Sequence, residues 1–106
     1  MQKGDIVLVS FPFSDLSGSK QRPALVLLET QFDVVLSFIT TNLQSQDTFD
    51  IIVSPSPINK LKKASLVKLS KIVTIDKSFV LGLLGSLEEE TIRMINLNMI
   101  KLFQLS

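Results

Sequence analysis

Two polar stretches of the sequence carry most of the side chains that could perform chemistry, at residues 13–22 (FSDLSGSKQR) and 40–46 (TTNLQSQ). The chain contains no histidine, cysteine, tyrosine or tryptophan. This composition excludes imidazole acids and bases, thiolate nucleophiles, zinc sites built on histidine or cysteine, and phenol chemistry. Catalysis by this chain therefore depends on carboxylates, Lys, Arg, Ser, Thr, Asn or backbone groups.

The composition is that of one folded globular domain. The chain has 106 residues, of which 45% are hydrophobic and 20% charged, and its net charge is +1. One domain over residues 1–106 fits this length, and the charge balance does not by itself require a nucleic-acid partner. The longest nearly apolar stretch, residues 79–87, is far shorter than the ~20 residues of a membrane helix. The N-terminal apolar run is too short for a signal peptide, so we expect a cytoplasmic protein without membrane attachment.

Apolar and β-branched runs predict a mainly β fold. Strands are expected over residues 6–11, 24–29, 32–40, 49–54 and, as one or two strands, 64–75. Polar loops are expected over residues 13–21 and 41–48. The segment at 79–84 fits a short strand or a helical turn equally well.

The C-terminal segment predicts one helix. Ser86 and Glu89 fit a capping box, as the N-cap and third helical residue. Apolar residues then recur at helical spacing, at Ile92, Ile95, Met99, Leu102 and Phe103. Five to seven short strands with a C-terminal α-helix indicate a small β-barrel, because closure of the sheet removes exposed strand edges.

On composition alone, the polar candidates have ordinary interpretations. An arginine such as Arg22 is commonly a solvated charge or part of a structural ion pair. Thr40 and Thr41 at a strand end fit β propensity and turn chemistry, and the KLKK run at 60–63 fits a solvated face. Arg22 is set apart by Pro23, which restrains the preceding residue to extended backbone.

Three segments in register resemble the MazF/PemK family, the toxins of bacterial toxin–antitoxin pairs. They are GDIVLVSFPFSDLSGSKQRPALVLL at 4–28, FITTN at 38–42 and SLVKLSKIVTIDKS at 65–78, and the resemblance runs from Gly4 to about Phe103. It implies an SH3-like β-barrel with a C-terminal helix, and a homodimer. It also implies an endoribonuclease that cuts single-stranded RNA, often mRNA, at short sequences. Such an enzyme uses no metal ion or other cofactor, leaves a 2′,3′-cyclic phosphate and a 5′-hydroxyl, and is blocked by a cognate antitoxin.

The resemblance also assigns roles to residues. It places the family's catalytic arginine on Arg22 and its catalytic threonine on Thr40, while Thr41 and Asn42 fall where some members contact RNA. The other RNA-binding candidates are Ser19, Lys20 and Gln21 beside Arg22, Lys62 and Lys63 as phosphate contacts, and Phe13 as a platform for base stacking. For Phe13, a position in the core is an equally good interpretation.

The proposed pair makes chemical sense without histidine. In this reaction the 2′-hydroxyl of the RNA attacks the adjacent phosphorus, and the enzyme must stabilise the negative charge that develops. A guanidinium offers five donors in a fork that matches phosphate oxygens, so Arg22 fits electrostatic stabilisation better than proton exchange. Thr40 would hydrogen-bond a non-bridging oxygen or the 2′-hydroxyl. The chain departs from the family in two ways: the loop before Arg22 has no glutamate, with Asp15 its nearest carboxylate, and Val73 replaces a frequent arginine.

Two other classes of protein are weighed against the nuclease. One is a non-catalytic toxin or binding protein on the same fold, comparable to relatives that poison DNA gyrase. The other is a peptide-binding SH3 module, which is disfavoured because aromatic-lined peptide grooves of that kind rely on tyrosine and tryptophan.

Overall fold

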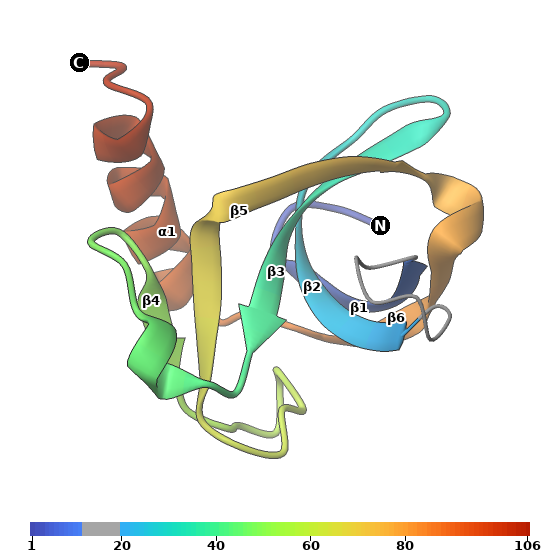
Figure 1. Cartoon of the computed structure of the whole chain (residues 1–106), viewed down its shortest axis with the longest axis horizontal. Coiled ribbons are helices and arrows are strands. Elements are labelled where there is room, and N and C mark those ends of the chain that lie inside the picture. The colour runs from blue at the N-terminus through green and yellow to red at the C-terminus, as the bar shows by residue number, and fades with distance from the viewer. Residues whose placement is uncertain (12–19) are drawn as a thin grey trace.

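A strongly curved antiparallel sheet with one helix on its outside forms the molecule (Figure 1). The computed structural model describes residues 1–11 and 20–106. Its described strands are β1 (Asp5–Phe11), β2 (Lys20–Glu29), β3 (Asp33–Thr40), β4 (Ile51–Val53), β5 (Ser65–Asp76) and β6 (Val80–Ser86). Its helices are two 3-10 turns, η1 (Leu43–Ser45) and η2 (Lys77–Phe79), and the α-helix α1 (Glu89–Leu102).

The order of strands in the sheet is β4-β5-β3-β2-β1-β6, and neighbouring strands are antiparallel. The expected mainly β fold with a C-terminal helix is confirmed. The expectation that closure removes the edges is wrong for the described ladder, in which β4 and β6 are edge strands. The β4–β5 loop covers part of the β6 edge instead, because Ser86 N donates to Ile58 O at 3.1 Å. A Cβ at Gly85 would lie 2.5 Å from Asn59 O, so this close approach requires glycine there.

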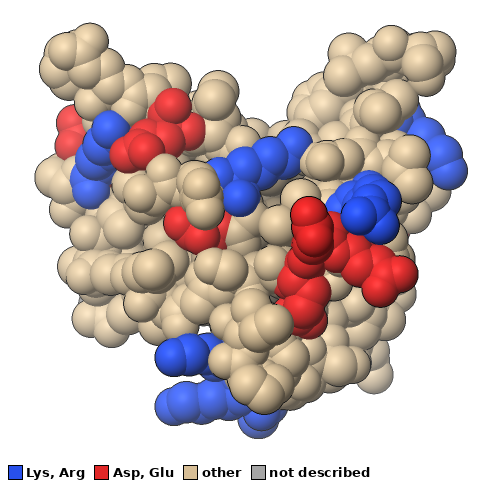
Figure 2. All heavy atoms as spheres, turned by 180° about the vertical axis from the view of Figure 1, so that it is seen from behind, with Lys and Arg blue, Asp and Glu red and all other residues tan. Residues whose placement is uncertain are grey.

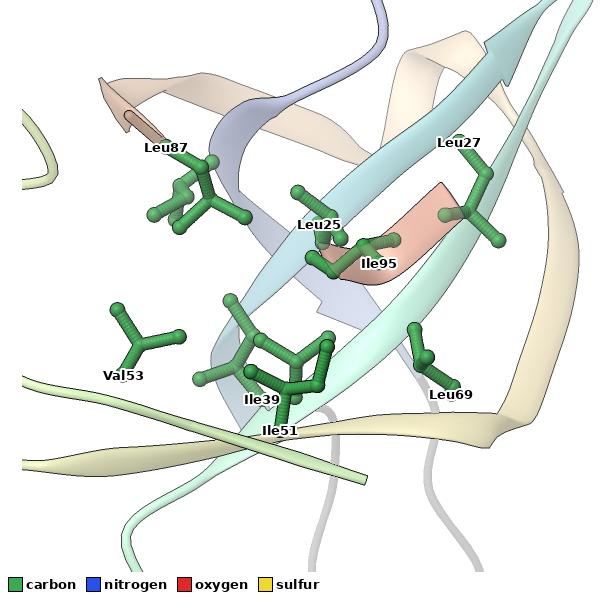
Figure 3. Close-up of a cluster of buried hydrophobic side chains, with 10 residues drawn as sticks. Leu25, Leu27, Ile39, Ile51, Val53, Leu69, Leu87 and Ile95 are labelled. Atoms are coloured by element: carbon green, nitrogen blue, oxygen red, sulfur yellow. The ribbon is translucent and has the colours of Figure 1, made fainter. Parts of the chain in front are cut away.

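Alternation along the strands divides the buried side chains between two cores on the two faces of the sheet. The first core lies between the sheet and α1 (Figure 3) and contains Ile6, Leu25, Leu27, Ile39, Ile51, Val53, Val67, Leu69, Leu87 and Ile95. The second core contains Val7, Val9, Ala24, Val26, Val34, Leu36 and Ile75. The curved sheet encloses this second core. The candidate site lies beside it, where β2 begins and β3 ends.

The helix begins later than the sequence predicts, and the capping-box prediction is wrong. Ser86 is the last residue of β6, where it pairs with Asp5 and its hydroxyl donates to Asp5 Oδ1 at 2.9 Å. The N-cap is Glu88, which makes no capping hydrogen bond with its side chain and instead accepts from Ser56 Oγ. Pairing with β1 therefore takes Ser86 away from the helix. Of the predicted apolar stripe, Phe103 is 50% exposed.

Two other boundaries also differ from the sequence prediction, and the structure decides one segment that the sequence leaves open. The strand β2 starts at Lys20, so Gln21 pairs with Ser10 and does not belong to the preceding loop. The fourth strand is only Ile51–Val53, and the undecided segment at 79–84 mainly forms β6.

An ion pair at the surface links the end of β2 to η2 and makes stability depend on pH. Glu29 Oε2 lies 3.0 Å from Lys77 Nζ, and Glu29 Oε1 lies 3.8 Å from the N-terminal amine. The hydrogen bond from Lys77 holds the pKa of Glu29 below its usual value, and both positive charges act in the same direction. A carboxyl whose pKa is lower in the folded protein stabilises the fold at pH values above the ordinary glutamate pKa of about 4.3. This contribution is lost as the pH falls through the pKa that the carboxyl has in the folded protein.

Glu29→Gln is accordingly expected to lower the free energy of unfolding at pH 7 by a small amount that disappears at low pH. Urea unfolding of both proteins at pH 7 and near pH 2.5 measures this. Asp33→Asn, at the start of β3, is the matched control and should change little at either pH. A deficit of Glu29→Gln that persists undiminished at low pH would contradict the role given to the ion pair.

Candidate functional site

The pairing of β2 with β3 brings Arg22 and Thr40 to the same place. Ala24 pairs with Phe38, and the same register continued by two residues sets Arg22 opposite Thr40. Side chains two residues apart on a strand share a face, so both side chains follow the face of Ala24. Both residues are half-buried. The two catalytic candidates are therefore neighbours in the structure, and their chemical roles stay predictions.

Two open cavities adjoin at this pair. The larger, of about 550 Å³, is lined by Arg22, Phe38, Ile39, Thr40, Ser45, Asp47, Lys68 and Lys71. The smaller, of about 180 Å³, is lined by Arg22, Pro23, Ile39, Thr40, Thr41 and Ser65. Because Arg22, Ile39 and Thr40 line both cavities, we treat them as one groove with this trio as its shared wall.

A bulge in β5 supplies two lysines to the groove. Ser37 pairs with Ile72 and Ile39 pairs with Val67, so residues 68–71 of β5 lie opposite Phe38 alone. Figure 1 shows β5 turning sharply part-way along its length. Bulges bend a strand and redirect its side chains. Lys68 and Lys71 would point to opposite faces of a regular strand, whereas here both line the larger cavity.

These two lysines, together with Ser45 and Asp47, are groove residues that the sequence does not predict. The sequence predicts one or two strands over residues 64–75 and does not place a bulge in them. The spacing of the lysines was an available but weak signal, since two charges three residues apart fit poorly on one face of a strand.

Lys68 is a buried cation held by residues 45–50, which begin at the last residue of η1. Its Nζ lies 2.7 Å from Asp50 Oδ2 and 3.8 Å from Asp47 Oδ2, and it donates to Ser45 O. The side chains of Lys68 and Asp50 are 7% and 1% exposed. Asp50 also accepts from Leu69 N at 3.0 Å and from Asp47 N at 2.8 Å. This network, which we call the Lys68 clamp, ties residues 45–50 to the bulge of β5.

The residues after Thr40 form a local turn. Thr40 Oγ1 accepts from Asn42 N at 3.1 Å, which leaves the hydroxyl hydrogen of Thr40 to donate elsewhere. Asn42 Oδ1 accepts from Gln44 N at 3.2 Å and so caps η1. Thr41 is exposed and lines the smaller cavity, whereas Asn42 lines neither cavity.

The remaining RNA-binding candidates do not converge on the groove. Lys62 and Lys63 are exposed in the β4–β5 loop and line neither cavity. The backbone of Lys63 is linked to the smaller cavity, because Lys63 O accepts from the hydroxyl of Ser65, which lines that cavity. Gln21 is exposed and, as a strand neighbour of Arg22, faces the other side of the sheet. Lys20 begins β2. The candidates Ser19 and Phe13 lie outside the described residues.

On the face shown in Figure 2, acidic and basic side chains lie side by side in several places, separated by uncharged surface. At the lower end of that view, where Figure 1 places the β4–β5 loop, basic side chains gather without acidic neighbours. Among the described residues, no group of three or more Asp and Glu side chains is placed to hold a metal ion. No helix in residues 1–11 or 20–106 is long and apolar enough to cross a membrane.

Comparison with known families decides what kind of protein carries this groove. The model of the PemK-like, MazF-like toxins of type II toxin–antitoxin systems matches residues 2–103. The chain belongs to this toxin family. A comparison with curated proteins gave no match.

Solved structures share the fold of this PemK/MazF-like toxin. The Mycobacterium tuberculosis toxin MazF-mt6 superposes with a TM-score of 0.78 at 20% identity, covering 96% of this chain and 98% of its own. An endoribonuclease in complex with its cognate antitoxin, from a mycobacterial species, gives 0.74 at 20% identity over 100% and 97%. A further mycobacterial endoribonuclease gives 0.69 at 20% identity over 98% and 91%. At this identity the likeness establishes the shared fold.

Proposed function

We propose that this PemK/MazF-like toxin is a sequence-specific endoribonuclease that cleaves single-stranded RNA, with messenger RNA as the expected target, at the groove. The observation that carries the proposal is the meeting of Arg22 and Thr40 on the wall shared by the two cavities. Family membership supports it, as do the structural neighbours that are named endoribonucleases.

The reaction is a transesterification within the RNA. The 2′-oxygen forms a bond to the adjacent phosphorus while the bond from phosphorus to the 5′-oxygen breaks. A proton leaves the 2′-hydroxyl and another reaches the departing 5′-oxygen, which leaves a 2′,3′-cyclic phosphate and a 5′-hydroxyl. Arg22 would donate to the non-bridging oxygens, where negative charge grows in the transition state. The free hydroxyl hydrogen of Thr40 would bind one of the same oxygens.

Other basic side chains would hold the RNA strand. Lys71 is exposed at the larger cavity, and Lys62 and Lys63 are exposed in the β4–β5 loop outside both cavities. Contacts of lysine with phosphates release counterions, so we expect binding to weaken as the salt concentration rises. The step requires no metal ion or other cofactor in this proposal, because Arg22 supplies the positive charge.

The chemistry of the product ends tests the proposed reaction. Fragments of a single-stranded transcript, produced in excess EDTA, should accept phosphate from ATP and polynucleotide kinase without prior phosphatase treatment, because their 5′ ends are free hydroxyls. Fragments with 5′-phosphates, or cleavage that stops in EDTA, would contradict the proposal. Intact RNA after long incubation would favour the non-catalytic binding protein, with DNA gyrase as the next target to test.

Exposed apolar side chains support two protein partners, a second copy of the chain and a cognate antitoxin. Met94 and Leu97 on α1, and Phe103 directly after it, are each at least half exposed. On β6, Leu81 and Leu83 are more than half exposed. Apolar surface of this extent on a small domain is typical of protein interfaces. The structural neighbour in complex with its antitoxin supports the second partner.

We place the homodimer contact on the outer face of α1, and Leu97→Glu is expected to weaken it. A buried carboxylate at an interface carries a large desolvation cost, so the variant should be monomeric at micromolar concentration while the wild type is a dimer. Sedimentation equilibrium measures both masses. Phe32→Glu, at an exposed apolar site in the β2–β3 turn, is the matched control and should stay dimeric. A wild-type monomer, or a dimer of Leu97→Glu with unchanged affinity, would contradict this placement.

A further inference from the structure

The larger cavity contains an acidic residue that does not suit a phosphate. Three of its lining side chains are cations, Arg22, Lys68 and Lys71, whereas Asp47 is an anion. A carboxylate repels the phosphates that those cations attract. A carboxylate is, however, a strong acceptor for the N–H groups on the edge of a nucleobase.

Asp47 is not needed to neutralise Lys68. Asp50 Oδ2 lies 2.7 Å from Lys68 Nζ and is buried with it, while Asp47 Oδ2 lies at 3.8 Å. The side chain of Asp47 is 69% exposed. Its carboxylate therefore has lone pairs available to a ligand in the groove.

The backbone of Asp47 is nevertheless held firmly. Asp47 N donates to Asp50 Oδ2 at 2.8 Å, and Asp47 O accepts from Asp50 N at 3.2 Å. Asp50 is in turn bound to Lys68 and to Leu69 N, both in the bulge of β5. The Lys68 clamp thus holds the backbone of Asp47 rigidly and leaves its carboxylate exposed. A selective binding site requires this arrangement.

We propose that Asp47 determines sequence specificity by accepting two hydrogen bonds from the Watson–Crick edge of a guanine close to the cleaved bond. This proposal rests on the proposed function and names a feature of its substrate. Guanine presents two adjacent donors, N1–H and N2–H, which match the two oxygens of one carboxylate. Adenine and cytosine each present one donor beside an acceptor, and the single N–H of uracil lies between two acceptors. Unpaired RNA exposes these edges, so a groove for single strands can reach them.

Binding of heptamers that differ in one base tests this directly. The probes are fluorescein-labelled U3XU3 strands with X as guanine, adenine, cytosine or uracil, methylated at every 2′-oxygen so that they cannot be cleaved. A uridine strand can slide along the groove, so a single guanine can reach Asp47. Fluorescence anisotropy should show that the wild type binds the guanine heptamer about tenfold more tightly than the uracil heptamer, as one bidentate base contact provides.

Asp47→Asn should remove this preference. It should weaken binding of the guanine strand, which loses the two-hydrogen-bond contact, and tighten binding of the other three strands, because it removes a negative charge from the groove. The amide offers one donor and one acceptor, so it suits adenine or cytosine better than guanine. The turn should survive the substitution, since Asp47 contributes its backbone N and O to it. Asp33→Asn is the matched control, because Asp33 begins β3 at the end opposite Thr40. It should keep the wild-type preference.

The absence of a guanine preference in the wild type, or an equal preference in Asp47→Asn, would overturn the proposal. Binding of none of the heptamers would overturn it as well. Cleavage of the unmethylated guanine heptamer is measured in parallel and reports on the proposed function separately. A guanine preference without cleavage would support the role of Asp47 in base recognition and contradict the nuclease assignment. Cleavage without the preference would support the nuclease assignment and contradict the role of Asp47.

Discussion

Arg22→Ala is expected to abolish the growth arrest that the toxin causes when bacteria express it without an antitoxin. Arg22 lies on the wall shared by both cavities and opposite Thr40, where a phosphate bound in the groove would contact it. Removing one donor that acts on transition-state charge typically costs about 10²–10³-fold in rate. Arg22→Lys keeps the charge but loses the planar fork, so its effect should be intermediate. Colony counts after induction measure the outcome.

The matched control is Arg93→Ala, which removes the other arginine of the chain. Arg93 is exposed on α1 and does not line the groove, so this variant should arrest growth like the wild type. Expression levels and melting temperatures need to be equal among the variants, since a half-buried Arg22 also contributes to packing. Growth arrest by Arg22→Ala at the wild-type level would contradict the catalytic assignment.

Lys68→Met is expected to destabilise the fold more than any other single substitution of a lysine in this chain. It would leave the Asp50 carboxylate, which is 1% exposed, without its cation. Breaking a buried ion pair by removing one partner typically costs about 3–5 kcal/mol. Residues 45–50 should then separate from β5, so RNA cleavage should fall as well. Urea unfolding followed by circular dichroism measures the loss of stability.

Two variants make this prediction specific to the Lys68 clamp. Lys71→Met changes an exposed lysine of the same bulge and should alter the free energy of unfolding by no more than about 0.5 kcal/mol. Adding Asp50→Asn to Lys68→Met should recover part of the loss, because it removes the buried charge and keeps an acceptor for Leu69 N. Equal stability of Lys68→Met and Lys71→Met would show that the Lys68 clamp does not hold residues 45–50 against β5.

The sequence predicts most of the fold because its strands and its helix follow simple periodicities. Alternation and β-branched runs located β1, β2, β3 and β5, and apolar spacing located α1. The capping-box prediction was wrong because it rests only on Ser86 and its neighbours in the sequence. In the structure, Asp5 competes for Ser86 from 81 residues away through the β1–β6 pairing.

Part of the candidate site was accessible from the sequence for a different reason. Arg22 and Thr40 could be singled out because they lie in motifs that resemble a family, and the β2–β3 register brings them together. The Lys68 clamp could not be found this way. It depends on the bulge at residues 68–71 of β5, which no glycine or proline marks in the sequence. It also depends on the ion pair between Asp50 and Lys68, which are 18 residues apart. Asp47 was passed over because a polar loop contains many such side chains and only the fold places this one in the cavity.

Cleavage of a long single-stranded transcript in excess EDTA, by the wild type and by Arg22→Ala, tests the central claim most directly. We predict discrete fragments from the wild type and intact RNA from the variant, with cleavage sites that map to one short sequence. Intact RNA with both proteins, or the same fragments from both, would contradict the claim that Arg22 is the centre of a metal-independent endoribonuclease.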